Sequence, residues 1–171
     1  MYENHNLIMS FKDTQFAEQI KKKGYWNYSD LYTFLFNWLK DESYTIKEKK
    51  YVEKLSDFGK EIQIEWEAVK KVSDYFRNTI KIKWHILGMK DAEIERDGKK
   101  EKTNKGEVKL DIQAVLERDW QDKWEDRPFW QFLRGIYDRY ILFTTIDEYE
   151  DRIIDTAVDL VADAKAFLEL Q

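Results

Sequence analysis

The stretch "EIQIEWEAV", residues 61–69, alternates apolar with polar side chains and decides the fold class. Successive side chains of a β-strand point to opposite sides, so this period of two predicts a strand with one buried face. The same period recurs in "IKIKWHI", residues 80–86, and in "EVKLDIQAVLE", residues 107–117. A weaker version, "YTIKEKKYVEKL", spans residues 44–55. With the turn signals between them, these segments predict an antiparallel meander of four to five strands.

The first two of these segments fit together as a hairpin. A symmetric register sets Trp66 opposite Trp84 and Glu67 opposite Lys83, with His85 opposite an acidic residue. Aromatic rings then meet on the core side and opposite charges on the solvent side, and each such pair stabilises a sheet by up to about 1 kcal/mol. The connection is wider than a tight turn, so a register shifted by two residues also satisfies the pattern.

Two turn signals follow these strands. "RDGK", residues 96–99, contains the Asp-Gly pair that is favoured in tight hairpin turns. "NKG", residues 104–106, is the second signal, and the charged residues between the two suit an exposed edge strand or loop. Modules that bind single-stranded nucleic acid usually stack bases on aromatic rings, and no ring interrupts these lysines. A solvated hairpin tip is therefore the favoured interpretation.

The segment "LYTFLFNWL", residues 31–39, predicts a helix because its apolar residues recur at helical spacing. Ser29 or Asp30 is the expected N-cap. The apolar surface of this helix, which includes Trp38, runs nearly all round it. We therefore expect the helix to lie inside the core or at a subunit contact.

The domain organisation is predicted to be simple. Residues 1–24 form a polar N-terminal segment, partly flexible, with at most a short helix ending before Gly24. Residues 25–171 form a single α+β domain, because a chain of 171 residues is too short for two ordinary domains to be expected.

The last third of the chain is predicted to be helical. Pro128 is tolerated in the first turn of a helix, and an apolar stripe at helical spacing follows it up to Tyr140. A longer helix is expected over residues 146–170. The predicted fold is therefore α+β, with an N-terminal helix, an antiparallel β-meander and two C-terminal helices packed on one face of the sheet.

The helix predicted after Pro128 has a second face, which lies roughly one quadrant away from its apolar stripe. Guanidinium groups and aromatic rings alternate on it, a composition suited to cation–π contacts with an anionic or aromatic partner. In the alternative interpretation, these arginines pair with the acidic final helix of the same chain. The face consists of Arg127, Trp130, Arg134 and Tyr137.

The final helix carries aspartates four residues apart, opposite its own apolar stripe. Like charges at this spacing repel, so the row is either a solvated face or a docking surface for a basic partner. One helix face lacks the convergent ligands that a metal ion needs, so no metal site is predicted. The row consists of Asp147, Asp151, Asp155, Asp159 and Asp163.

Composition narrows the function classes. The net charge is -5, and the acid is concentrated from Glu117 onward, where 14 acidic residues stand against 7 basic ones. Nucleic-acid binders normally carry a basic excess, so that class is disfavoured. The opening residues lack a secretory signal and no apolar run approaches the length of a membrane span, so we expect a cytoplasmic protein.

The sequence contains no motif of a known enzyme mechanism. It has no cysteine, and its two histidines, His5 and His85, lack the spacing of metal ligands. A glycine-rich phosphate loop and a serine nucleophile elbow are also absent from it. We therefore expect no cofactor and rank an enzyme below the binding functions.

The leading hypothesis is a non-enzymatic interaction module that binds a protein partner or itself. Its surfaces would be the helix that carries Trp38 and the face that runs from Arg127 to Tyr137. Arginine and large aromatic residues are the usual hot spots of protein interfaces.

The alternative hypothesis is a binder of a small hydrophobic ligand or lipid. Its cavity would lie between the final helix and the sheet positions Trp66, Trp84 and Ile112. Such a cavity predicts unpaired polar groups among the residues around it. An enzyme is the third hypothesis and a nucleic-acid factor the fourth.

Overall fold

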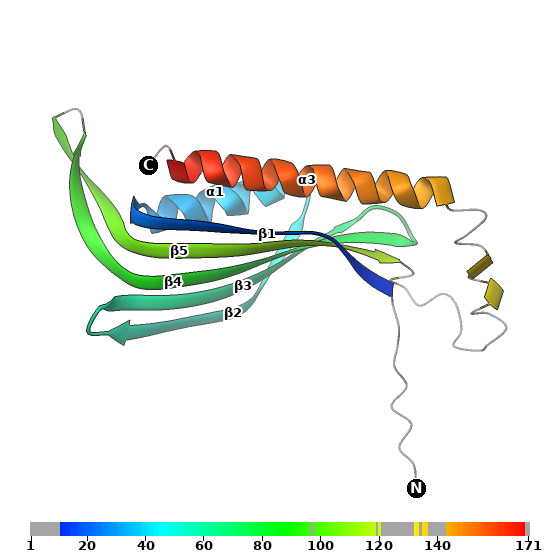
Figure 1. Cartoon of the computed structure of the whole chain (residues 1–171), viewed down its shortest axis with the longest axis horizontal. Helices are drawn as coiled ribbons and strands as arrows, with labels where there is room; N and C mark the ends of the chain where they lie inside the picture. The colour runs from blue at the N-terminus through cyan, green and yellow to red at the C-terminus, as the bar shows by residue number, and fades with distance from the viewer. Residues whose placement is uncertain are drawn as a thin grey trace, which may run out of the picture.

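The chain forms a bent, five-stranded antiparallel sheet, and its helices lie along one side of that sheet (Figure 1). The computed structural model describes residues 11–96, 98–118, 120, 132–133, 135–136 and 143–169. The strands lie in the order β1-β5-β4-β3-β2, so the predicted meander runs from β2 to β5, and β1 extends it beside β5. The elements are β1 (Phe11–Trp26), α1 (Tyr28–Asp41), β2 (Thr45–Ser56), β3 (Gly59–Lys71), β4 (Phe76–Arg96), β5 (Lys99–Arg118) and α3 (Phe143–Glu169).

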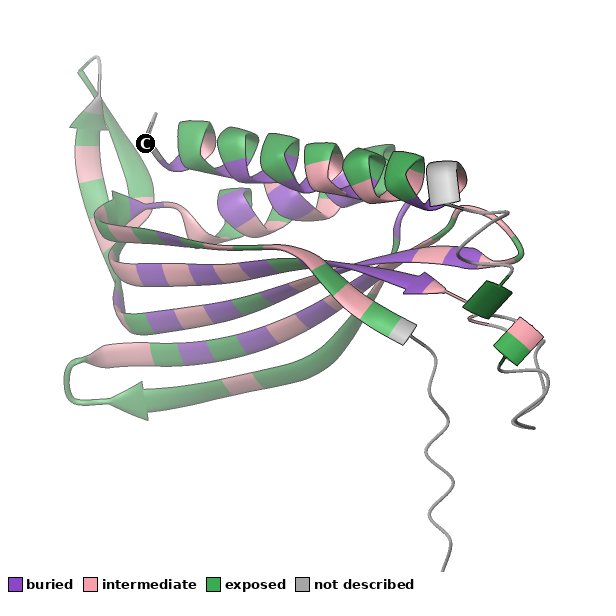
Figure 2. Cartoon of the chain, turned by 45° about the vertical axis from the view of Figure 1, so that its right-hand side comes forward, coloured by how far each residue is buried: buried purple, intermediate pink, exposed green. Residues whose placement is uncertain are grey.

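The predicted period of two is confirmed in the three central strands. Figure 2 shows buried and exposed residues alternating along them. Strand β2 is exposed over almost all of its length, which explains why its sequence pattern is weak. The inward residues of β3, β4 and β5 form the floor of the core, and they are Ile62, Ile64, Trp66, Ala68, Ile80, Ile82, Trp84, Ile86, Val108, Leu110, Ile112 and Ala114.

The symmetric register of the β3–β4 hairpin is wrong, and the register shifted by two residues is the one that forms. Trp66 lies opposite Ile82 instead of Trp84. The turn sets this register, because the carbonyl oxygen of Phe76 accepts hydrogen bonds from the backbone N–H groups of Val72 and Ser73, each at 3.1 Å. The two tryptophans remain diagonal neighbours, with ring centroids 5.2 Å apart in an edge-to-face arrangement.

The shifted register also changes the charge pairs on the outer face of the sheet. Glu67 lies opposite Lys81, and His85 lies opposite Gln63 where an acid was expected. The acidic neighbour of His85 comes from the other side, since its Nε2 lies 3.8 Å from Oδ2 of Asp111 on β5.

The short helix predicted in the N-terminal segment is wrong, because β1 occupies this part of the chain. Phe16 and Ile20 are four residues apart, a spacing that fits a strand as well as a helix. The inward position between them holds Glu18, which hides the period of two from the sequence. Glu18 is paired across the core edge with Lys165 of α3. An ion pair therefore replaces the apolar contact that would have identified this strand.

One of the two predicted turns is confirmed. Strands β4 and β5 pair up to Arg96 and Lys99, on either side of the Asp-Gly turn. The turn predicted at residues 104–106 is wrong, because these residues lie inside β5. Asn104 instead uses its side-chain oxygen to accept a hydrogen bond from the backbone N–H of Tyr28, at 3.0 Å. Asn104, a residue type that is common in turns, therefore links β5 to the start of α1.

The sheet bends along a line of glycines on four adjacent strands. Gly24 lies opposite Gly106. A Cβ atom on Gly106 would lie 3.0 Å from the Cα of Met89, and one on Gly59 would lie 2.7 Å from the carbonyl carbon of Gly88. Side chains at these positions would hold the strands apart. Beyond this line, β4 and β5 continue as a two-stranded arm that turns up past the start of α1 (Figure 1).

Helix α1 lies against the sheet and also contacts α3. It begins at Tyr28, and its N-cap is Asn27, whose side chain accepts a hydrogen bond from the N–H of Asp30 at 3.1 Å. The N-caps predicted two and three residues further on are therefore wrong. The inward leucines of this helix, Leu31, Leu35 and Leu39, are completely buried.

The α+β class with an antiparallel sheet is confirmed, but the predicted layout of three helices is not matched. The described residues contain two long helices, α1 and α3. Most of the segment expected to form the first C-terminal helix lies outside those residues. The stripe predicted for the final helix is confirmed, since Ile146, Ile153, Ala157, Leu160, Ala164 and Leu168 are all buried.

We predict that Gly59→Ala destabilises the fold more than Gly24→Ala does. Both glycines have a strongly positive φ, 128° and 121°, so both variants carry similar backbone strain of about 1–3 kcal/mol. Only the alanine at position 59 would also press into β4, which adds a packing cost of about 1–3 kcal/mol. Urea unfolding of both variants measures the difference. Equal losses of unfolding free energy would show that the contact between Gly59 and β4 carries no cost.

Candidate partner-binding surface

The arginine-aromatic face lies outside the part of the chain that the structure describes, so its role stays a prediction. Its residues are Arg127, Trp130, Arg134 and Tyr137.

The acidic row lies on the exposed face of α3, as its spacing indicates. Within the described residues, four of its aspartates form no ion pair, and they are Asp147, Asp151, Asp155 and Asp159. The fifth, Asp163, accepts a hydrogen bond through its Oδ2 from the indole N–H of Trp38 at 2.8 Å. A docking role for the row stays a prediction.

Trp38 therefore lies at a contact inside the chain, between α1 and α3. Close by, the rings of Phe34 and Phe167 stack with centroids 4.6 Å apart and an interplanar angle of 15°. These contacts, together with the buried leucines of α1, place this helix in the core, one of the two locations that its all-round apolar surface predicted. Trp38 is only partly covered by α3, and its role in partner binding stays a prediction.

The positions predicted to line a cavity all lie on the inner face of the sheet. Trp66, Trp84 and Ile112 are all buried. Tyr32 of α1 covers both tryptophans, with ring centroids 4.7 Å and 5.9 Å from theirs. Phe36 adds an edge-to-face contact with Trp66 at 6.2 Å. The aromatic surface that the sequence displays is thus packed against a helix of the same chain.

Polar groups in this aromatic cluster are only partly paired. Glu48 Oε2 accepts hydrogen bonds from the hydroxyl of Tyr32 at 3.2 Å and from the indole N–H of Trp66 at 3.3 Å. Burial, followed by the charge of Glu48, raises the pKa of Tyr32, so this hydroxyl stays protonated and donates. The buried indole N–H groups of Trp26 and Trp84 have no hydrogen-bond acceptor among the described residues.

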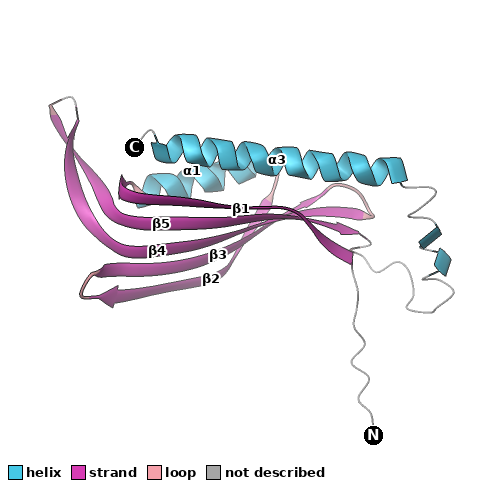
Figure 3. Ribbon diagram, viewed as in Figure 1, coloured by secondary structure: helices cyan, strands magenta, loops and turns pink. Residues whose placement is uncertain are grey.

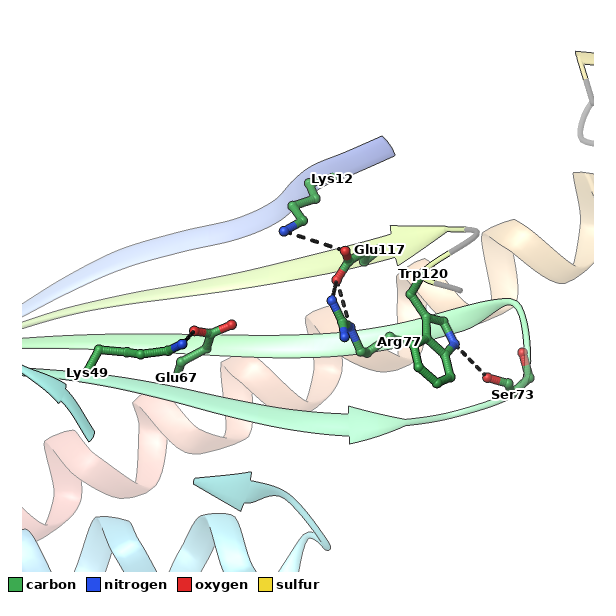
Figure 4. A network of polar contacts seen from close by, with 7 residues as sticks. All are labelled: Lys12, Lys49, Glu67, Ser73, Arg77, Glu117 and Trp120. Carbon is green, nitrogen blue, oxygen red and sulfur yellow. Dashed lines mark hydrogen bonds and ion pairs between the residues drawn. The ribbon is translucent and has the colours of Figure 1, made fainter. Parts of the chain in front are cut away.

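A charged network joins the far ends of β1, β4 and β5 (Figure 4). Glu117 is only 4% exposed, and it accepts a hydrogen bond from Nε of Arg77 at 2.8 Å. Lys12 lies 3.5 Å from the other carboxylate oxygen. The guanidinium of Arg77 also lies over the ring of Trp120, 5.4 Å from its centroid. The indole N–H of Trp120 donates to the carbonyl oxygen of Ser73 at 3.1 Å. The paired charges mark this network as structural support for the strand ends.

A groove of about 670 Å³ crosses the outer face of the sheet at the glycine line. Bending the sheet toward the helices spreads side chains on its outer face, and Figure 3 shows that the described helices lie on the opposite side. Glycines form the floor, and charged and apolar side chains rise on both sides. The lining residues are Lys23, Gly24, Phe58, Glu61, Leu87, Gly88, Lys90, Lys105, Gly106 and Glu107.

Exposed apolar side chains gather near this groove. Phe58, in the turn between β2 and β3, is 81% exposed, and Leu87 of β4 is 49% exposed. Leu55 is also 81% exposed, but it pairs with Lys60 and therefore lies on the side of the sheet that faces the helices, away from the groove. Sequence reasoning missed this surface. The only local signal is an aromatic residue next to a glycine in a turn, where polar residues are usual.

No protein-family model matches the chain, and no curated protein matches it significantly. In the part of the chain that the structure describes, no helix combines the length and apolarity needed to cross a bilayer. The same residues contain no cluster of histidine, cysteine or acidic side chains that could hold a metal ion. A cytoplasmic location stays a prediction.

We predict that Arg77→Met lowers the free energy of unfolding by about 2 kcal/mol, because it leaves the buried carboxylate of Glu117 with one partner. Lys12→Met is the matched control. The Lys12 side chain is 55% exposed, so its loss should cost less than about 1 kcal/mol. Chemical denaturation of the two variants tests this order. A larger loss for Lys12→Met would show that Arg77 is not the main partner of Glu117.

Proposed function

We propose that this protein is a non-enzymatic interaction module that binds a protein partner at the bend of its sheet. The observation that carries the proposal is the exposure of two large apolar side chains, Phe58 and Leu87, in the lining of one groove. Single exposed apolar residues are ordinary, but two of them lining one groove are typical of interaction sites.

The free edge of the sheet supports binding through side chains rather than through strand addition. Strand β2 is the outer strand on this side, and the segment "KEKK", residues 47–50, is fully charged. A bulge also interrupts its pairing with β3 between Glu48 and Lys50. Charge and bulges on an edge strand oppose pairing with another chain. Phe58, in the turn beyond this strand, is therefore the more accessible contact.

We predict that a photo-crosslinking amino acid at position 58 captures a protein partner in cells and that one at position 100 does not. Lys100 is an exposed control position on the arm. Changing Leu87 to serine should abolish the adduct, because a buried apolar anchor contributes about 1–2 kcal/mol or more to an interface. Leu55→Ser is the matched control on the other side of the sheet and should leave the adduct in place. Both exposed positions should leave the unfolding free energy unchanged within about 0.5 kcal/mol. An adduct that survives Leu87→Ser, or its absence at position 58, would contradict the proposal.

A small-ligand binder is the second candidate, and one observation favours it. The buried indole N–H groups of Trp26 and Trp84 lack an acceptor among the described residues, and an unpaired buried donor costs about 1–3 kcal/mol. Trp84 is one of the positions at which a cavity predicts an unpaired group. A ligand with a carbonyl or hydroxyl oxygen would satisfy such a donor.

We predict for this second candidate that the intact protein carries a small molecule in native mass spectrometry. Trp84→Phe should lower the occupancy, because it removes the donor that the ligand oxygen would use. Trp66→Phe is the control, since its indole already donates to Glu48. A bare protein mass, or equal occupancy in the two variants, would rule out this use of Trp84.

A further inference from the structure

The groove at the bend has a shape that follows from the strand register. Lys23, Glu107 and Leu87 lie opposite one another on β1, β5 and β4 and form one row of side chains. Lys105 and Lys90 form the next outward row, because outward residues alternate with inward ones. The inward row between them contains the glycines at which the sheet bends. The two outward rows therefore spread apart, and the space between them is the groove.

The floor of the groove allows a close approach by another main chain. Gly24, Gly88 and Gly106 line it and offer main-chain atoms only. The ladder between β4 and β5 is also interrupted between Leu87 and Lys90. At one end, Phe58 of the neighbouring hairpin adds an apolar wall. An extended peptide with one bulky apolar side chain fits these features.

The charge around the groove is more basic than the chain as a whole, which has a net charge of -5. Within the described residues, Lys23 and Lys90 form no ion pair, although both line the groove. Glu107 is neutralised in part by Lys21, whose Nζ lies 3.0 Å from its Oε1. Lys105 lies over the ring of Tyr25, 5.2 Å from its centroid, and keeps its charge at the rim. Two lysines are thus available to bind carboxylates.

We propose that this groove binds an acidic peptide segment of a partner protein, with a large apolar side chain against Phe58 and Leu87. The inference rests on the proposed function and adds the chemistry of the partner. Lysine ammonium groups on flexible stems bind carboxylates without a fixed geometry, which suits a short linear segment.

The test uses the full chain and a fluorescein-labelled nonapeptide with a central tryptophan and two aspartates on each side. Fluorescence anisotropy should show saturable binding that weakens as salt is added, because surface ion pairs are screened. Reversing both groove lysines, Lys23→Glu with Lys90→Glu, should weaken binding by about tenfold or more, and Phe58→Ser by about fivefold or more. Lys100→Glu, a reversal outside the groove, should change it by less than about twofold.

Two further measurements decide between occupants. A peptide with lysines in place of the aspartates should not bind, and equal binding of this peptide would overturn the inference. Phe58→Ser should not change the binding of vesicles that contain phosphatidylcholine and phosphatidylserine. If the protein binds these vesicles but not the acidic peptide, the inference is overturned in favour of a membrane surface. Circular dichroism checks that each variant is folded. If the Lys23→Glu, Lys90→Glu variant is not folded, the Lys23→Gln, Lys90→Gln variant replaces it.

The failure of this inference is distinguishable from the failure of the proposed function. If the photo-crosslinker at position 58 captures a partner but the acidic peptide does not bind, the partner has different chemistry and only the inference fails. If the crosslinker captures nothing and the peptide does not bind, both fail. Self-association that is lost in the Lys23→Glu, Lys90→Glu variant would assign the groove to a second copy and would also overturn the inference.

Discussion

The close packing of Gly59 against β4 is the constraint on which the rest of this structure depends. A Cβ atom at this position would lie only 2.7 Å from the backbone of Gly88, so the β2–β3 turn can lie against β4 only because residue 59 is a glycine. The bend that results has two consequences. On the inner side, the sheet curves toward α1 and α3, and its apolar rows become a closed core. On the outer side, the same bend separates two rows of side chains and opens a groove. Core and groove therefore have one cause.

The sequence predicted the elements that repeat a burial pattern, and it failed where a tertiary contact replaces that pattern. Strands β3, β4 and β5 and the stripe of α3 were predictable because their inward positions are almost all apolar. Strand β1 was not, because one inward position holds Glu18, whose charge is balanced by Lys165 from the other end of the chain. The register of the β3–β4 hairpin was ambiguous by two residues, since a shift of two preserves every side-chain direction. Only the hydrogen bonds of its turn decide it.

The surfaces show the same division between local and long-range information. Alternation predicted that Trp66 and Trp84 share one face, and they do contact each other, although diagonally. That Tyr32 would cover them depends on the path of α1 over the sheet, which no local pattern specifies. The groove was beyond sequence reasoning for a different reason. It lies where Gly24, Gly88 and Gly106 of three neighbouring strands come together, and isolated glycines have no periodicity to detect.

The edge strand β2 opposes pairing with other strands, while an apolar side chain beyond its end stays exposed. Along β2, the unpaired backbone edge is protected by charged side chains and a bulge, so another strand gains little by pairing there. Phe58 is exposed where this strand has ended and the chain turns toward the bend. At that point the strand edge stops, and another molecule can reach this apolar side chain without continuing the sheet. Charge along the edge and an apolar group at its end together favour a small, side-chain-mediated contact over open-ended association of sheets.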